Sequence, residues 1–304
     1  MGQKDKASKF LEAYNDVFAD IFNVLVFDDN YIDVTGLSNE DSETQSFGYD
    51  GNLHSSFRDC IKRYHNSNFI CVSLGIENQT TVDNTMPVRM MGYDYNSYLK
   101  QLQNENFISP VLSLVLYFGE NEWETPLSLT DMMTGVDDVV LSKVNDYPIQ
   151  VVNMRRLTPE LCNRFQSDFS VIADFFAGQD NDDYYPVDRP IRHTEAVLHF
   201  FSVFTGDARY RDITEDVLED EQKGQVISMC KVIDRFEQKG IEKGIKQGIK
   251  QGVEQGLEKG LKTLVSTLKS LLLSFDDIYE KVMLYEVYQN YTRDDVKRIY
   301  EEIV

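Results

Sequence analysis

Three polar residues at a short spacing could together hold a metal ion and a water molecule. Asp59 precedes an alternating apolar segment that ends in Glu77, and Gln79 follows Glu77 after one residue. Alternation of period two is typical of a strand, so Glu77 and Gln79 fall on one face of it. Mg²⁺ prefers carboxylate oxygens, and once bound it acidifies its water and screens charge on a phosphate. The spacing therefore permits metal-assisted hydrolysis of a phosphate ester, or it marks the solvated end of a strand.

A hairpin would bring Asp59 to Glu77. The polar sequence HNSN lies between two apolar runs and is typical of a turn between antiparallel strands. A three-residue loop pairs His65 with Phe69, which sets Asp59 opposite Gly75 and on the face of Glu77. A two-residue loop would turn Asp59 to the apolar face, where an unpaired carboxylate is costly. We therefore expect the first register.

An Asp followed across a hairpin by Glu-x-Gln resembles the active site of the PD-(D/E)XK nucleases, with Gln79 at the position of the Lys. Residues 75–102, GIENQTTVDNTMPVRMMGYDYNSYLKQL, resemble the segment after the active-site strand in the recombination-promoting nuclease (Rpn) family, also called the YhgA-like putative transposases. Residues 18–28, residues 109–133 and a Gly-rich tail resemble the same family in the same order. The resemblance extends from about residue 10 to about residue 262.

This resemblance implies a metal-dependent DNA endonuclease, a hydrolase of the recombination-promoting type. Asp59 and Glu77 would bind Mg²⁺, with Mn²⁺ as a substitute, and Gln79 would orient the attacking water. Arg89 would contact a phosphate or anchor Glu77, the alternative being a surface arginine packed over a tyrosine. In the wider superfamily the first helix often lends an acidic residue to the metal. Asp20 is the candidate here, the alternative being a plain surface acid.

The chain as a whole predicts an α/β fold. Residues 7–23 carry an apolar helical face, and residues 24–50 are rich in Ser and Asp and predict a loop. A helix is expected over residues 83–103. The nearly continuous apolar run 111–118 predicts a strand covered on both faces, and residues 149–154 predict another. These elements fit the mixed sheet flanked by helices that the PD-(D/E)XK resemblance implies.

A Gly-rich segment divides the chain into three predicted parts. Residues 240–260 repeat a glycine at every fourth position, followed by an aliphatic residue. We expect a nuclease-like domain over residues 1–235, a repeat helix or linker over 236–262 and a helical tail over 263–304. Glycines weaken an isolated helix. Pairing with the same segment of a second chain, which makes a homodimer, is the preferred interpretation, and a semi-rigid linker is the alternative.

The charge of the chain opposes contact with DNA. The sequence holds 51 acidic and 30 basic residues, a formal net charge of −21, which repels nucleic acid. A local basic patch can outweigh this field within a Debye length of about 8 Å. The candidates for such a patch are Arg58, Lys62, Arg63, Arg89, Arg155 and Arg156. The same charge suits the alternative function, a catalytically weak, nuclease-derived protein that binds DNA or protein and assists assembly.

Cysteine usage and hydropathy predict a cytoplasmic protein. The cysteines are scattered and form no C-x-x-C pair, which fits free thiols in a reducing compartment: Cys60, Cys71, Cys162 and Cys230. No stretch approaches 18 consecutive apolar residues, so no contact with a membrane is expected.

Overall fold

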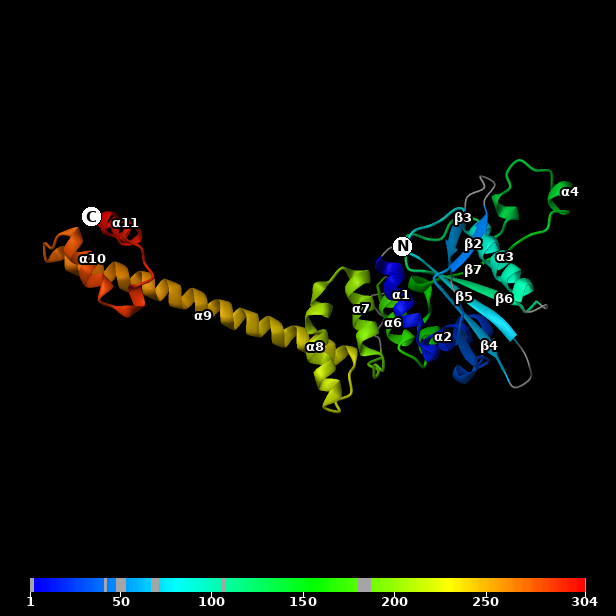
Figure 1. Cartoon of the computed structure of the whole chain (residues 1–304), viewed down its shortest axis with the longest axis horizontal. Coiled ribbons are helices and arrows are strands. Elements are labelled where there is room, and N and C mark those ends of the chain that lie inside the picture. Colours follow the sequence, from blue (N-terminus) through cyan, green and yellow to red (C-terminus); the bar gives the residue numbers. More distant parts are fainter. Residues whose placement is uncertain are drawn as a thin grey trace. The chain divides into compact units, whose positions relative to one another are not determined.

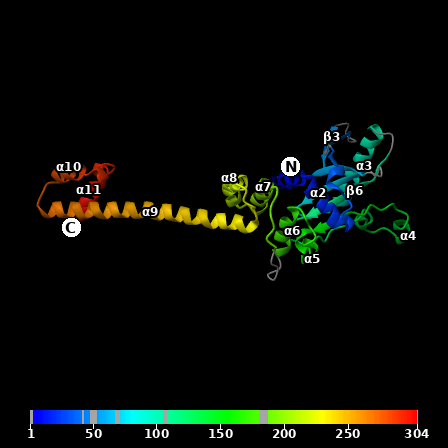
Figure 2. The same ribbon diagram turned by 90° about the horizontal axis from the view of Figure 1, so that it is seen from below.

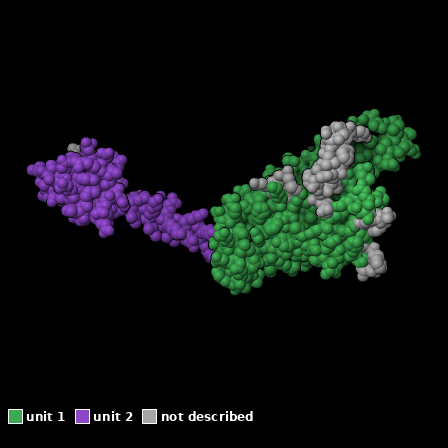
Figure 3. Space-filling view, viewed as in Figure 1, with its two compact units in different colours: residues 1–233 green, residues 234–304 purple. Residues whose placement is uncertain are grey.

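The computed structural model describes residues 3–40, 43–47, 53–66, 71–104, 108–179 and 187–303. The chain divides into two compact units, residues 1–233 and residues 234–304 (Figure 3). Within the described ranges, no helix combines the length and the apolar character needed to cross a membrane. Cys60 and Cys71 are free thiols.

A five-stranded mixed sheet forms the centre of the first unit (Figure 1). Its strands, in spatial order, are β1 (Leu37–Asn39), β4 (Cys60–His65), β5 (Cys71–Gln79), β6 (Val111–Tyr117) and β7 (Gln150–Asn153). The pairs β1–β4 and β4–β5 are antiparallel, whereas β5–β6 and β6–β7 are parallel. The sheet, with helices around it, confirms the predicted α/β class.

The segment predicted as a loop over residues 24–50 contains regular structure. Residues Leu37–Asn39 form the edge strand β1. A separate two-stranded sheet pairs β2 (Glu43–Phe47) with β3 (Leu53–Phe57). The prediction was wrong because short strands rich in Ser, Thr and Gln lack the alternation of apolar residues that indicates a strand in a sequence.

The hairpin register differs from the predicted one by two residues. His65 pairs with Cys71, and Cys60 pairs with Ile76. The predicted partner Phe69 lies outside the described residues. Because side chains alternate with period two, a shift of two residues leaves every side chain on its predicted face. The observed register, extended by one residue, places Asp59 opposite Glu77 and not opposite Gly75.

Helices cover both faces of the central strand. Helix α3 (Met86–Asn104) links β5 to β6 and packs Met86 and Met90 against Val115 of the sheet. Helices α1 (Gln3–Glu12) and α2 (Asn15–Phe22) lie at the opposite face, where Cys60 Sγ of β4 donates to the Glu12 carbonyl. The middle of β5 is therefore buried on both sides, as its position in the sheet requires.

The predicted helix over residues 7–23 is interrupted. It forms α1 and α2, with the chain leaving the helical path between Glu12 and Asn15, and a π-helical turn over Asn23–Phe27 follows. At the break, Lys62 Nζ donates to the Ala13 carbonyl and to Asn15 Oδ1, at 2.5 and 2.7 Å. These bonds satisfy a carbonyl that the interruption leaves without a helical partner.

Further helices complete the first unit: α4 (Asp138–Leu141), α5 (Pro159–Cys162), α6 (Phe169–Gly178), α7 (Thr194–Thr205) and α8 (Ala208–Gln222). Helices α6 and α7 share an aromatic cluster with the end of β6, because Phe118 lies edge-on to Phe176 and Phe204 at centroid distances of 4.9 and 5.2 Å. This cluster closes the core at the carboxyl end of the parallel strands.

The second unit contains a long helix and a small bundle. Helix α9 (Met229–Ser270) is continuous through the glycine repeat (Figure 2). Its last turns pack on α10 (Phe275–Met283) and α11 (Arg293–Glu302) around a core of Leu261, Val265, Ile278, Val282, Val296 and Ile299. Between the glycines, Ile241, Ile245, Ile249 and Val253 are each more than half exposed. Both the repeat and the predicted tail thus belong to this unit.

Candidate active site

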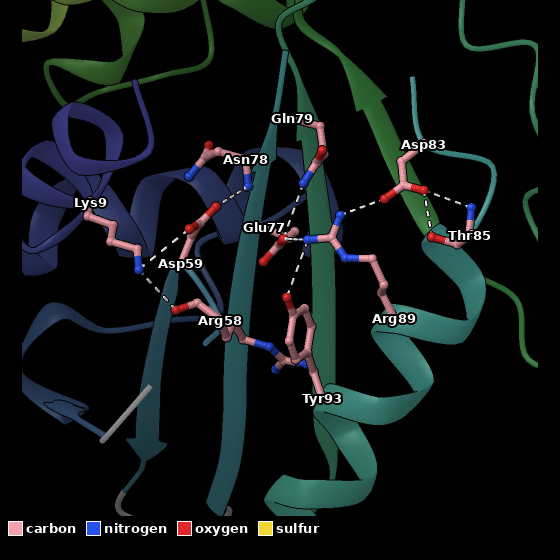
Figure 4. A network of polar contacts seen from close by, with 10 residues as sticks. All are labelled: Lys9, Arg58, Asp59, Glu77, Asn78, Gln79, Asp83, Thr85, Arg89 and Tyr93. Atoms are coloured by element: carbon pink, nitrogen blue, oxygen red, sulfur yellow. Dashed lines mark hydrogen bonds and ion pairs between the residues drawn. The ribbon is translucent and has the colours of Figure 1, made fainter. Parts of the chain in front are cut away.

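Glu77 lies near the carboxyl end of β5, where strand alternation turns it toward α3. Its Oε1 accepts hydrogen bonds from Arg89 Nη2 at 2.5 Å and from Gln79 Nε2 at 3.2 Å (Figure 4). The residue is 3% exposed, and no hydrogen bond to its Oε2 comes from the residues that the structure describes. One carboxylate oxygen is therefore fixed in place, and the other remains a buried acceptor.

Asp59 is held beside Glu77 by the backbone of the neighbouring strand. Its Oδ2 accepts a hydrogen bond from the Asn78 backbone N–H at 2.8 Å, and its Oδ1 lies 3.5 Å from Lys9 Nζ of α1 (Figure 4). The predicted convergence of Asp59 with Glu77 follows from the unchanged parity of the register. Gln79 lies on the same face as Glu77, as expected.

The environment of Glu77 opposes its negative charge. The pKa of Glu77 is raised to about 7: burial is the largest cause and the charge of Asp59 adds to it, while Arg89 and Arg58 act in the opposite direction. Near neutral pH this carboxyl is poised between its two protonation states. A cation placed beside Asp59 and Glu77 would favour the ionised form.

Arg89 joins the site to the start of α3. Its Nη1 donates to Asp83 Oδ2 at 2.6 Å, and its Nη2 bonds both Glu77 and the Tyr93 hydroxyl, the latter at 3.3 Å (Figure 4). Arg89 was expected either to contact a phosphate or to anchor Glu77, and its hydrogen bond to Glu77 Oε1 shows the second arrangement. The Arg89 side chain is 35% exposed, so it also faces solvent.

Glu12 is an acidic residue of the site that the sequence did not indicate. It ends α1, is 2% exposed, and accepts a hydrogen bond from Asn78 Nδ2 at 3.1 Å. The pKa of Glu12 is raised to about 8: burial is the largest cause and the charges of Asp59 and Glu77 add to it, while the bond from Asn78 acts in the opposite direction. A signal existed in the sequence: Asn78, between Glu77 and Gln79, must face the sheet side opposite to both.

Asp20 occupies a different place. Its Oδ2 accepts hydrogen bonds from the backbone N–H groups of Gln166 and Ser167, at 2.8 and 2.7 Å. The structure does not bring it to Asp59 and Glu77. Within the described parts of the chain, no three or more His, Cys, Asp or Glu side chains are grouped so that they could hold a metal ion.

Two of the basic residues expected to meet DNA are buried. Lys62 is 0% exposed and caps the break between α1 and α2, so its expected role in phosphate contact was wrong. Arg58 is 3% exposed, and its Nη2 donates to Asp94 Oδ1 at 2.5 Å. Its guanidinium crosses β5 at Gly75, where a Cβ atom would lie 2.1 Å from Nη1. Only glycine leaves room for this arginine.

The remaining predicted bases pair with acids. Arg63 lies 3.7 Å from Glu40, Arg155 lies 3.8 Å from Glu120, and Arg156 bonds Glu122 at 2.7 Å. Lys9, which the sequence did not single out, is a base that contacts Asp59. Among the described residues, Lys9 and Arg89 therefore bring positive charge to the two carboxylates.

Comparison with known proteins finds a family match over part of the chain. No curated protein and no solved structure matches the chain. Residues 27–168, which include β1 to β7 with Asp59, Glu77, Gln79 and Arg89, match the family described as "Putative transposase, YhgA-like". The match confirms, for this part of the chain, the family resemblance read from the sequence, and residues 27–168 are similar to the YhgA-like putative transposases.

Proposed function

We propose that the protein is a Mg²⁺-dependent DNA endonuclease with a PD-(D/E)XK-type active site. The observation that carries this proposal is the buried Oε2 of Glu77, which accepts no hydrogen bond from the described residues and lies beside the Asp59 carboxylate. A buried acceptor without a partner is costly unless a ligand uses it. The likeness of residues 27–168 to a family of putative transposases supports chemistry on DNA.

The donor set fits Mg²⁺, with Mn²⁺ as a substitute. Asp59 and Glu77 would hold the ion, since Mg²⁺ is commonly bound by one or two carboxylates, with waters and phosphate oxygens completing its shell. When bound, the ion supplies an acidified water and neutralises charge on the phosphate. Arg89 holds Glu77 in position through Oε1, which leaves Oε2 for the metal. Lys9 balances the charge of Asp59 and offers a positive charge to the DNA backbone.

Gln79 has a narrower role than a lysine at this position would have. Its Nε2 donates to Glu77 Oε1, so its amide is fixed at the site. An amide can accept a hydrogen bond from a water but does not take the proton of that water at neutral pH. Gln79 therefore orients the attacking water, and the proton must pass to another group or to solvent.

The test is incubation of the purified protein with supercoiled plasmid DNA. We expect nicked or linear DNA in Mg²⁺ or Mn²⁺ and intact plasmid in EDTA. Intact plasmid under every metal condition, with DNA nevertheless bound, would leave the chain as a nuclease-derived binding protein. The net charge of −21 and the ion-paired bases weaken attraction to DNA, so they favour the protein-binding form of this second candidate, an assembly protein.

We also propose that α9 pairs two chains. Its aliphatic residues are exposed, and a Cβ atom at any glycine from Gly240 to Gly256 would meet nothing within 4 Å. A second helix could therefore approach closely along this side. A symmetric pair would also hold two copies of the active site in one assembly.

Replacement of two residues of this stripe tests the pairing. Ile245→Gln with Ile249→Gln keeps good helix formers but removes the apolar surface. Light scattering should give twice the 35.2 kDa chain mass for the wild type and the single mass for the variant. Lys246→Gln, one residue from the stripe, is the matched control and should stay dimeric. If the double variant is still a dimer, the contact between the chains lies outside the repeat.

A further inference from the structure

A cavity of about 560 Å³ lies beside the candidate active site, within the first unit. Its floor is the carboxyl end of two strands, since Thr80 follows β5 and Phe118 follows β6. Three helices contribute the walls: Lys4 comes from α1, Phe175 from α6 and Phe204 from α7. The volume is typical of pockets that take small organic groups.

Aromatic rings form one part of the cavity wall. Phe118 is buried, whereas Phe175 and Phe204 are only partly buried and present ring surface to the cavity. Phe204 stacks on Phe200 at a centroid distance of 4.1 Å, which fixes its plane. Rings fixed in this way offer a planar apolar surface to another flat group, and every nucleobase has such a face.

Two cations stand at the same cavity. Lys4 Nζ lies 5.5 Å from the centroid of the Phe204 ring. The Arg155 side chain is 13% exposed and its Nη2 lies 3.8 Å from Glu120 Oε1. Glu120 is 87% exposed, so this ion pair contributes little. Aromatic rings with nearby cations are the chemistry that binds a base together with its phosphates.

The cavity lies next to Gln79 of the candidate active site. Thr80 follows Gln79 directly, and the Phe118 backbone N–H donates to the Gln79 carbonyl at 2.8 Å. Helix α1 also spans the two places, with Lys4 at the cavity and Glu12 bonded to Asn78. Eight residues of helix measure about 12 Å. This length corresponds to a few nucleotides of a DNA strand.

We propose that this cavity binds one unpaired nucleobase of the DNA strand, a few nucleotides from the bond that is cut. Phe175 and Phe204 pack against the base, and Lys4 and Arg155 contact its flanking phosphates. A base paired inside a duplex cannot enter without leaving the stack. The inference rests on the proposed nuclease function and adds its substrate class, namely DNA with a single-stranded or unpaired segment.

The experiment measures binding without cleavage. A fluorescent 20-nucleotide single strand, and the same sequence as a duplex, are titrated with the full-length protein in EDTA and followed by anisotropy. We expect the wild type to bind the single strand at least about tenfold more tightly than the duplex. Stacking of one base on aromatic side chains contributes about 1–3 kcal/mol, and about 1.4 kcal/mol corresponds to tenfold in affinity. The double variant Phe175→Leu with Phe204→Leu should lose this preference while its duplex affinity is unchanged.

Three further variants and probes make the result specific. Tyr95→Leu, an exposed aromatic on α3, is the matched control and should bind like the wild type. Lys4→Ala, on the surface, should reduce the slope of binding against salt by about one. It also serves as the readout if the double variant fails to fold. A 2-aminopurine base in the strand should change its fluorescence on binding to the wild type but not to the double variant.

The two proposals fail separately. Equal affinity for both DNA forms, or an unchanged preference in a folded double variant, overturns the base pocket even if the wild type cuts DNA. A wild type that binds single strands through Phe175 and Phe204 but leaves DNA intact in Mg²⁺ overturns the nuclease, and the pocket stands.

Discussion

An amide in place of the carboxylate at position 59 or 77 should lower Mg²⁺-dependent DNA cleavage by about a thousandfold or more. Asp59→Asn and Glu77→Gln preserve shape and remove one metal ligand charge each. Metal ions supply several kcal/mol of transition-state stabilisation, and each tenfold in rate corresponds to about 1.4 kcal/mol. The amide oxygen introduced by Asp59→Asn can still accept the bond from the Asn78 backbone N–H, so the strand end should stay in place.

The measurement combines cleavage with metal binding. Mg²⁺ should raise the melting temperature of the wild type and not of either amide variant. Asp83→Asn is the matched control, because Asp83 also bonds Arg89 but lies outside the carboxylate pair. Gln79→Ala should reduce cleavage by only about ten- to a hundredfold, since it removes an orienting group. Wild-type cleavage by folded Asp59→Asn would remove Asp59 from the metal site.

Glu12→Gln should make the protein more stable at alkaline pH. The pKa of Glu12 is about 8 in the folded state, chiefly because the carboxyl is buried, against 4.5 for a glutamate exposed to water. The folded protein therefore binds this proton more tightly than the unfolded chain does. Its contribution to stability is complete below pH 4.5 and is lost as the pH rises through about 8. Glutamine carries no charge at any pH and keeps an acceptor for Asn78.

Thermal unfolding at two pH values measures this effect. At pH 8.5 we expect the melting temperature of Glu12→Gln to exceed that of the wild type by about 5 °C or more, and at pH 5 the two should be close. Glu219→Gln, an exposed carboxylate on α8, is the control and should show no gain that depends on pH. A loss of stability in Glu12→Gln at pH 8.5 would mean that the buried carboxylate is charged and paired.

The sequence predicted the sheet faces better than the sheet register. Alternation of period two places Glu77 and Gln79 on one face whatever the loop length, and Asp59 shares that face for any even shift of the register. The observed shift of two residues changed the partner of Asp59 from Gly75 to Glu77 and left its face unchanged. For the same reason Asp59 and Glu77 lie on the same face, although the predicted hairpin loop was two residues shorter than the observed one.

Residues whose partners come from distant segments could not be placed in this way. Lys62 looks like an exposed base in its strand, but its ammonium bonds the break between two helices 47 residues earlier in the chain. Helical periodicity predicted one helix over residues 7–23, but the chain forms two helices there. The acidic residue that lies near the site is therefore Glu12 at the end of the first helix, and not Asp20 in the second. Periodicity reports which face is apolar, but not where a helix is interrupted by tertiary contacts.

The period of the α9 repeat limits how a partner helix can follow it. An α-helix turns about 100° per residue, so each four-residue step carries the aliphatic stripe about 40° further around the axis. From Ile241 to Leu257 the stripe has moved about 160°, almost to the far side of the cylinder. Two straight helices can therefore share only a short crossing. Contact along the whole repeat requires the pair to wrap around each other with a right-handed twist, the hand opposite to that of heptad coiled coils.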